Sequence, residues 1–343
     1  MLTLPGAAPL LSGPMLSATL IVRDEAPRLR RCLDSIRHFV DEIVVVDTGS
    51  VDETPDIAAS YGARVLRSPW RDDFSFHRKE ALDAATGRWT FVIDGDEELE
   101  QGWSLRSTVA QLDAAGGADS VVVQVQAVGD RGPSEEFHAI RAFRREVGRY
   151  KYPVHNQLIG PEKPALSKAR VRSYYVGTLA DKVDRSLPLL RRMLDEDPQS
   201  AHAAFFLCKT LWASGRMGEC IEAGGRAAEL VGSAPGYASL WVWLFYAAMA
   251  VDGPVAAERW LAEGLERHPW YPELLHTRIV ADLLRWNASM SDPVRYAFAS
   301  QVSSRFVRNL PQVARLLGVP LEFTASAEPE MEMTSTADEG ARG

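Results

Sequence analysis

The sequence predicts an α/β domain followed by an all-α domain built from helical repeats. From Ser17 onward, short β-branched runs alternate with longer helical patterns, which is the rhythm of a parallel sheet flanked by helices. After about residue 180 the strand character disappears. Three prolines then recur at spacings of 37 and 34 residues, at Pro198, Pro235 and Pro269, which indicates a repeated helical unit.

Length and composition agree with two soluble domains. A chain of 343 residues exceeds the size, about 250 to 300 residues, at which single cores stop growing. No apolar run reaches the roughly 18 residues that a membrane span needs, so we expect no transmembrane segment. The three cysteines are scattered through helical patterns, which predicts neither disulfides nor zinc and favours the cytoplasm. The net charge of -8 argues against nucleic acid as a partner.

Both ends are expected to lie outside the folded domains. Residues 1–14 are broken by three prolines and lack a positive region, so they are interpreted as a loose extension and not as a signal peptide. Met15, directly before the first strand, is an alternative start of translation. Residues 321–343 carry six carboxylates against one arginine and predict a disordered acidic tail.

The α/β domain is predicted to span residues 15–180. Pro27 suits a first helical position, and Asp52 and Asp73 are predicted helix caps. The first four strands are expected at 17–22, 42–46, 63–67 and 89–93, the intervening helices at 27–39, 53–61 and 74–85, and a later strand pair at 120–128 and 137–143.

The second domain, residues 181–320, has the period of about 34 residues that is typical of tetratricopeptide (TPR) repeats. Helices are expected at 220–230, 237–250 and 256–267, after an apolar helix that follows Pro198. Core packing is favoured over a sugar-stacking surface for six tryptophans of this domain: Trp212, Trp241, Trp243, Trp260, Trp270 and Trp286.

Polar motifs follow three of the predicted strands. Open α/β sheets bind ligands beyond the carboxyl ends of their strands, and here those ends are followed by residues 23–25, 47–50 and 94–96. Asp94 and Asp96 supply the hard oxygen ligands that Mg²⁺ or Mn²⁺ prefers, with a solvated acidic turn as the alternative. Asp47 is suited to a ribose hydroxyl or a base imide, whereas Ser50 and Asp52 are assigned to the turn and the helix cap.

Taken together, the motifs around residues 20–25, 45–52, 70–82 and 89–97 resemble the family 2 glycosyltransferases. They are most similar to a bacterial subgroup, akin to lipopolysaccharide-core glucosyltransferases and peptide S-glycosyltransferases, that often carries helical repeats behind the catalytic domain. The likeness covers residues 17–180 in order. It implies a GT-A type sheet, a nucleotide-sugar donor and inversion at the anomeric centre.

The resemblance also implies roles for individual residues of the donor site. Asp47 matches the nucleoside-binding carboxylate, and Arg23 with Glu25 matches the wall of the base pocket. Arg78 matches a basic residue near the diphosphate. Asp94 contributes to donor binding as well.

The metal signature of the family is matched by Asp94 and Asp96. The implied cofactor is Mn²⁺ or Mg²⁺, with a UDP-sugar favoured as donor. The metal and cationic side chains would stabilise the departing diphosphate.

An inverting transfer also needs a base beside the acceptor. The candidates are Glu97, Glu98 and His155, with His155 favoured for the acceptor site and a structural loop histidine as the alternative. The subgroup has His-Glu where this chain has His155-Asn156, which removes the obvious carboxylate. It also has Arg-Asn where this chain has Arg78-Lys79, and His before Gly-Tyr where this chain has residues 174–177. The basic stretch Arg141, Arg144, Arg145, Arg149 and Lys151 is assigned either to the diphosphate or, as the commoner case, to a solvated face.

The sequence therefore predicts an inverting, metal-dependent glycosyltransferase acting on a saccharide, a peptide or another acceptor. The alternative is a non-catalytic sugar-nucleotide-binding scaffold that recruits a protein or peptide partner through its helical repeats. A nucleotidyltransferase is disfavoured, because residues 23–27 are neither glycine-rich nor basic enough for a phosphate loop.

Overall fold

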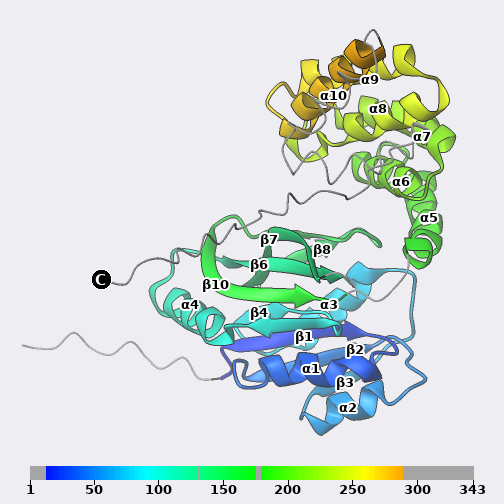
Figure 1. Ribbon diagram of the computed structural model, residues 1–343. Coiled ribbons are helices and arrows are strands. Elements are labelled where there is room, and N and C mark those ends of the chain that lie inside the picture. Colours follow the sequence, from blue (N-terminus) through cyan, green and yellow to red (C-terminus); the bar gives the residue numbers. More distant parts are fainter. Residues whose placement is uncertain (1–12, 130–131, 175–178, 289–343) are drawn as a thin grey trace, which may run out of the picture. The chain divides into compact units, whose positions relative to one another are not determined.

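The computed structural model describes residues 13–129, 132–174 and 179–288, which divide into two compact units after Pro198 (Figure 1). The expected acidic tail lies outside the described residues, as does the expected N-terminal extension apart from Gly13 and Pro14. The first unit is an α/β sheet domain and the second is all-helical, so the fold class predicted from the sequence is confirmed.

An eight-stranded mixed sheet in the order β3-β2-β1-β4-β7-β6-β10-β5 forms the first unit. Its parallel half contains the four strands expected from the sequence, joined by the expected helices. These elements are β1 (Leu16–Val22), α1 (Ala26–Ile36), β2 (Glu42–Asp47), α2 (Thr54–Ser60), β3 (Arg64–Arg67), α3 (Phe74–Ala84) and β4 (Trp89–Val92).

The other half of the sheet is mostly antiparallel. β7 (Gly132–Arg144) pairs with β4 and with β6 (Ser120–Gly129), which confirms the expected strand pair. β10 (Pro164–Ser173) lies parallel to β6, and β5 (Glu97–Glu100) closes the edge antiparallel to β10. α4 (Gly102–Ala115) and a small ribbon of β8 (Arg149–Lys151) and β9 (Gln157–Ile159) complete the unit; none of α4, β5, β8, β9 or β10 was expected.

Successive side chains of a strand point to opposite faces of the sheet, and each face packs against its own layer of helices. In β1, Leu16, Ala18, Leu20 and Val22 are all nearly inaccessible to solvent and belong to the main core, together with apolar residues of α1, α2 and α4. The opposite face packs against α3, whose Leu82 joins a second apolar cluster with residues of β4 and β7. A period-2 pattern in the sequence thus determines which side chains meet which helices.

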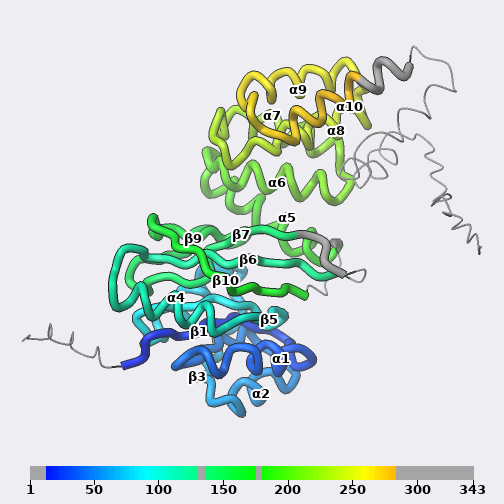
Figure 2. The backbone as a smooth tube through the Cα atoms, turned by 60° about the vertical axis from the view of Figure 1, so that its left-hand side comes forward, coloured from blue at the N-terminus to red at the C-terminus, as the bar shows by residue number. Residues whose placement is uncertain are grey.

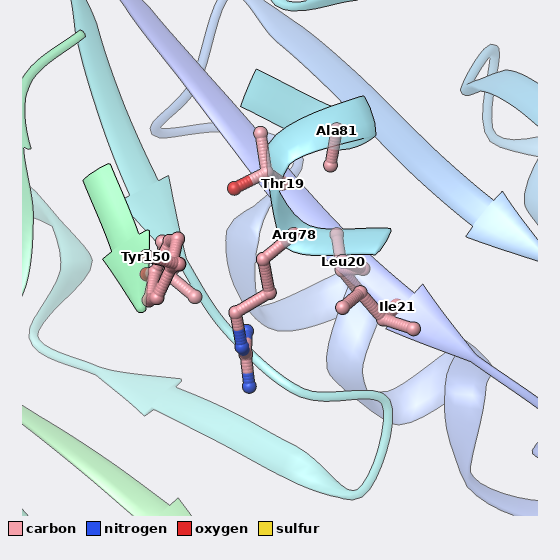
Figure 3. A pocket seen from close by; sticks show the side chains of 7 residues that line it. Thr19, Leu20, Ile21, Arg78, Ala81 and Tyr150 are labelled. Atoms are coloured by element: carbon pink, nitrogen blue, oxygen red, sulfur yellow. The ribbon is translucent and has the colours of Figure 1, made fainter. Parts of the chain in front are cut away.

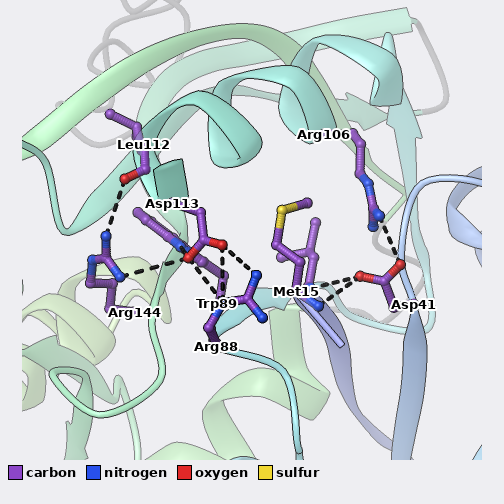
Figure 4. Close-up of polar contacts among 9 residues, drawn as sticks. Met15, Asp41, Arg88, Trp89, Arg106, Leu112, Asp113 and Arg144 are labelled. Carbon is purple, nitrogen blue, oxygen red and sulfur yellow. Dashed lines mark hydrogen bonds and ion pairs between the residues drawn. The ribbon is translucent and has the colours of Figure 1, made fainter. Parts of the chain in front are cut away.

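Ion pairs tie α4 to the amino edge of the parallel strands (Figure 4). The Asp113 carboxylate accepts hydrogen bonds from Arg88 Nε at 3.0 and 3.2 Å and from Trp89 Nε1 at 3.2 Å, and Arg144 Nη1 lies 3.8 Å away. Asp41 accepts from the Met15 backbone amide and from Arg106. These contacts hold the start of β1 and of β4 in place.

The second unit consists of consecutive packed helices (Figure 2). α6 (Ala201–Ala213) packs against α7 (Met217–Val231), and α8 (Leu240–Val251) packs against α9 (Pro254–Arg267) and α10 (Pro272–Ala288). α7 and α8 approach each other closely at Gly224, because a Cβ on this residue would lie 2.1 Å from the Leu244 side chain of α8. Trp241 and Trp260 are buried, as core packing predicts, whereas Trp270 is exposed.

One helix lies between these regions in the sequence. α5 (Leu179–Glu196) begins where the sequence placed the domain boundary, at residue 180, but its contacts group it with the sheet unit. Within the described ranges, no helix combines the length and the apolar character that crossing a membrane requires.

Candidate functional site at the carboxyl edge of the sheet

The loops after β1 and β2 are joined by backbone-to-side-chain hydrogen bonds. Val22 and Asp47 are register partners at the ends of these strands. Beyond them, the Asp24 amide donates to Ser50 Oγ at 2.9 Å and the Glu25 amide donates to Thr54 Oγ1 at 2.7 Å. Asp24 adopts a left-handed conformation with φ of 54°. The motifs at residues 23–25 and 47–50 therefore form one connected rim, as the parallel arrangement predicts.

Asp47 and the expected cap residues have separate roles in this rim. Asp47 is 4% exposed, and its Oδ1 accepts from the Ser50 amide at 3.1 Å. Asp52 accepts from the Thr54 and Ala26 amides, as its place in the turn predicts. The predicted cap is wrong by one residue, because Glu53 occupies the N-cap position of α2. At the next helix Asp73 caps α3 through the Phe76 amide, as expected.

Beside this rim lies an open cleft of about 240 Å³. Its lining combines two aromatic rings, two arginines and a carboxylate: Ile21, Val22, Arg23, Glu25, Thr48, Trp70, Phe74 and Arg185. The rings of Trp70 and Phe74 meet edge to face at 4.6 Å. A cleft with aromatic walls and charged groups is suited to a flat polar heterocycle.

Arg78 and Asp94 form an ion pair at the acidic turn. Arg78 Nη2 lies 3.0 Å from Asp94 Oδ1, and its side chain is 14% exposed, between β1 and the ring of Tyr150 (Figure 3). Burial raises the pKa of Asp94, but the charges of Arg78 and Arg141 outweigh this effect and lower it. Asp94 is therefore ionised and oriented.

Glu97 is tied into the same network. Its Oε1 accepts from Arg141 at 2.7 Å, and its Oε2 accepts from the Asp94 backbone amide at 2.9 Å. The residue is 3% exposed, and burial raises its pKa to about 7 despite Arg141. With both oxygens occupied by neighbours, Glu97 braces the turn at residues 94–96.

Asp96 differs from its two neighbours. Burial, together with the charges of Asp94 and Glu25, raises its pKa to about 6. Among the residues that the structure describes, no basic side chain lies within 4.0 Å of its carboxylate. Gly95 brings this turn against Glu25, because a Cβ there would lie 3.1 Å from Glu25 Cγ.

These features fit a divalent cation whose coordination shell is completed by oxygen atoms of a bound ligand. No group of three or more His, Cys, Asp or Glu side chains in the described part of the chain is arranged to hold a metal by itself. Mg²⁺ and Mn²⁺ sites with one or two carboxylates and substrate phosphates do not need such a group. Asp96, whose pKa is raised by burial and by neighbouring negative charge, is the carboxylate that a cation would stabilise most.

The remaining candidates lie on two segments. Glu98 accepts a hydrogen bond from the Tyr174 hydroxyl at 3.1 Å and lies 3.8 Å from Arg31 Nε. His155 is exposed in the loop between β8 and β9, with φ of 49°. That loop is anchored to the start of α3, because the Phe74 amide donates to Pro153 O at 2.8 Å. Residues 175–177, part of the segment where the subgroup has His before Gly-Tyr, lie outside the described residues.

The basic stretch does not act as one surface. Arg141 is buried against Glu97, Arg144 lies beside Asp113 and Leu112, and Arg145 donates to Gly87 O. Only Arg141 belongs to the carboxyl-edge network. Arg141 and Arg144 of β7 and Arg145 directly after it thus contact different neighbours, whereas Arg149 and Lys151 are exposed on β8.

Sequence reasoning missed four residues of the site: Arg28, which pairs with Glu25 at 2.7 Å; Tyr150; the cleft residue Phe74; and Arg185. Arg28 had a detectable signal, since Glu25 and Arg28 are three residues apart at a helix start. Arg185 had none, because it lies more than a hundred residues beyond the rest of the lining.

The fold and site define an α/β domain with an open cleft and an acidic turn at the carboxyl edge of its sheet. Residues 17–168 match the family model described as Glycosyl transferase family 2.

Curated relatives match over shorter segments. The chain is 52% identical over 100 residues to a TPR repeat-containing protein of Synechococcus elongatus, covering 29% of this chain and 25% of that protein. It is 37% identical over 86 residues to an uncharacterized glycosyltransferase of Rickettsia felis, covering 25% and 30%. It is 33% identical over 85 residues to the glycosyltransferase SunS of Bacillus subtilis, covering 24% and 20%. The matches thus span less than a third of these relatives' lengths.

Solved structures with similar folds are more distant in sequence. Glucosyl-3-phosphoglycerate synthase from Mycobacterium tuberculosis, in complex with Mn²⁺ and UDP-glucose, is 20% identical, with a TM-score of 0.40 over 53% of this chain and 79% of that one. The S. aureus TarS fragment 1–349 is 14% identical, with a TM-score of 0.43 over 75% and 93%. Likenesses at this level carry no functional argument.

Proposed function

We propose that this protein is a metal-dependent, inverting glycosyltransferase that uses a nucleotide-sugar donor, with a UDP-sugar favoured. The observation that carries the proposal is the Asp96 carboxylate, on a turn that packs against the cleft residue Glu25. Its pKa is raised, and no basic side chain in the described part of the chain lies within ion-pair distance of it. The family match over residues 17–168 supports sugar transfer as the chemistry.

The proposed donor site extends from the cleft to the acidic turn. Arg23 and Glu25 form the wall for the base, and Asp47 binds the nucleoside from the adjoining rim. Asp94 and Asp96 would hold Mn²⁺ or Mg²⁺, which would supply positive charge beside the diphosphate leaving group. Arg78 adds positive charge beside Asp94 and keeps its carboxylate ionised.

For the acceptor proton we propose His155 or Glu98 as the base. Glu97 is assigned a positioning role instead, because its two oxygens already bind Arg141 and the Asp94 amide. Replacing a general base costs about 10² to 10⁴ in rate, so either His155→Ala or Glu98→Gln should slow transfer by that factor while leaving donor binding unchanged. Transfer rates in both variants that equal the wild-type rate would remove both residues from this role.

The proposed acceptor is a saccharide, a peptide or another nucleophile, and the helical unit is proposed to influence its choice. The competing function is a binding scaffold without catalysis. Hydrolysis of the donor separates the two, because a scaffold would bind the nucleotide sugar and leave it intact.

Asp96→Ala tests the metal assignment. We expect the variant to fold and to lose the increase in UDP affinity that Mn²⁺ gives the wild type, as measured by calorimetry with and without the metal. Asp83→Ala is the matched control, since Asp83 is an exposed carboxylate of α3 paired with Lys79. Metal-enhanced binding that persists in Asp96→Ala would contradict the assignment.

A further inference from the structure

Helix α5 reaches the cleft although it follows the family 2 region, which ends at residue 168. Arg185 of α5 is one of the cleft-lining residues. Its guanidinium carbon lies 5.2 Å from the centroid of the Phe74 ring, which is within the range of a cation–π contact. The sheet unit therefore receives part of its cleft wall from a helix that the family domain does not include.

A second arginine fixes α5 against the same segment. Arg192 follows Arg185 by two helical turns and so lies on the same face of the helix. Its Nη2 donates to the Asp72 carbonyl oxygen at 2.9 Å, and its Nη1 lies 4.0 Å from the Asp72 carboxylate. Asp72 in turn accepts from Trp70 Nε1 at 2.7 Å.

The segment held in this way is itself part of the rim. The Trp70 amide donates to Thr48 O at 3.1 Å, and the Ser68 amide donates to Asp47 O at 2.9 Å. A chain of contacts thus runs from Arg192 through Asp72 and Trp70 to the end of β2. Arg185 is placed over the cleft by its own contact with Phe74 and by the contact of Arg192 with Asp72, which anchors α5. This placement lowers the entropic cost of using Arg185 in binding.

We propose that Arg185 contacts the base of the donor nucleotide and that α5 is a structural part of the donor site. The inference rests on the proposed function. The cleft lining contains Thr48 and Arg23 but neither Arg78 nor the acidic turn, so Arg185 lies on the nucleoside side and away from the proposed diphosphate position. A planar guanidinium donates hydrogen bonds to carbonyl oxygens of a base and stacks on its face, whereas an ammonium group offers only a point charge.

The test compares nucleotide binding by the full chain and its variants. UDP, GDP and dTDP are titrated in the presence of Mn²⁺ into the wild type, Arg185→Ala, Arg185→Lys and Arg191→Ala; Arg191 is the control, an exposed arginine of α5 outside the cleft lining. For the diphosphate that binds the wild type best, we expect about a tenfold loss in Arg185→Ala, a loss that Arg185→Lys does not restore, and no loss in Arg191→Ala.

A second readout separates base contact from phosphate contact. The affinity ratio between the nucleoside diphosphate and its monophosphate should be the same in Arg185→Ala as in the wild type, because the lost contact is to the base. A ratio that falls, or full restoration by Arg185→Lys, would assign Arg185 to phosphate charge and overturn the inference. Wild-type binding with no change in Arg185→Ala would also overturn it and leave the proposed function standing. Absence of binding by the wild type would reject both.

Discussion

The two edges of the parallel strands are equally rich in charge but use it in opposite ways. At the amino edge, hydrogen bonds from Arg88 lower the pKa of Asp113, and amide and Arg106 hydrogen bonds lower that of Asp41 against the effect of burial. At the carboxyl edge, burial and like charge raise the pKa of Asp96 to about 6 and that of Glu97 to about 7. One edge is electrostatically satisfied, and the other has an excess of negative charge.

This difference indicates where stability and function are located. A carboxylate whose pKa is lowered by its partners contributes to folding, whereas one whose pKa is raised by its neighbours costs folding free energy at neutral pH. Such a cost is expected at sites arranged for a ligand. Six substitutions test the contrast between the edges.

The largest effect is expected from Asp113→Ala. Removing this carboxylate, whose side chain is 7% exposed, leaves Arg88 and Trp89 Nε1 without their shared acceptor. The free energy of unfolding should fall by about 3 kcal/mol in urea titrations, while UDP affinity at the opposite edge stays unchanged. Asp113→Asn, which keeps the shape, should lose less; a stability equal to that of the wild type in both variants would contradict the structural role of this edge.

A pair of glycines gives the next contrast. A Cβ on Gly87, at the amino edge, would lie 2.8 Å from the Ser17 backbone nitrogen, and one on Gly95 would meet only the flexible Glu25 and Val22 side chains at 3.1 and 3.2 Å. We expect Gly87→Ala to cost about 2 kcal/mol of stability and Gly95→Ala less than about 1 kcal/mol. Gly95→Ala should instead weaken UDP binding by moving Glu25. A larger loss of stability in Gly95→Ala, with weaker UDP binding in Gly87→Ala, would show that stability and ligand binding are not divided between the two edges.

Asp96→Asn is expected to stabilise the protein. Because the folded pKa of Asp96 is raised, its favourable contribution is present below the unfolded value, near 3.9, and is lost as the pH rises through about 6. The variant should therefore exceed the wild type by about 1 to 2 kcal/mol at pH 7.5 and match it near pH 4, both in a metal chelator. Urea titrations at the two pH values measure the difference.

Asp113 provides the control of opposite sign for this measurement. Its folded pKa is lowered, so its contribution is present above the unfolded pKa and is lost as the pH falls through the folded value. The stability gap between the wild type and Asp113→Asn should shrink toward low pH. The sign of the difference distinguishes the two sites, because at pH 7.5 Asp113→Asn should be less stable than the wild type and Asp96→Asn more stable. A wild type that is more stable than Asp96→Asn at pH 7.5 would mean that Asp96 has a cationic partner.

Arg106→Ala should have the smallest effect. Arg106 and Asp41 are separated by 2.7 Å, but their side chains are 36% and 29% exposed, so solvent screens the pair. A loss of about 0.5 to 1 kcal/mol is expected in urea titrations. A loss as large as that of Asp113→Ala would show that exposure does not determine the strength of pairs at this edge.

Local patterns predicted the parallel half of the sheet well. The runs before residues 23, 47 and 94 formed strands because their alternation and β-branching match a buried parallel sheet, and Asp73 capped α3 as its sequence position indicates. The strand β5 was missed, because a four-residue run with three glutamates has no local strand signal and gains its pairing from β10, about seventy residues away.

The sequence by itself determined the order of strands and helices, the helical character of the second unit, and the presence of acidic motifs at strand ends. These follow from periodicity and turn chemistry, which act over a few residues. Tertiary structure alone decided that Arg141 braces Glu97, that Asp94 and Glu25 raise the pKa of Asp96, and that Arg185 enters the cleft from α5. Burial, pairing and pKa depend on which distant side chains meet, and a local pattern contains no information about such contacts.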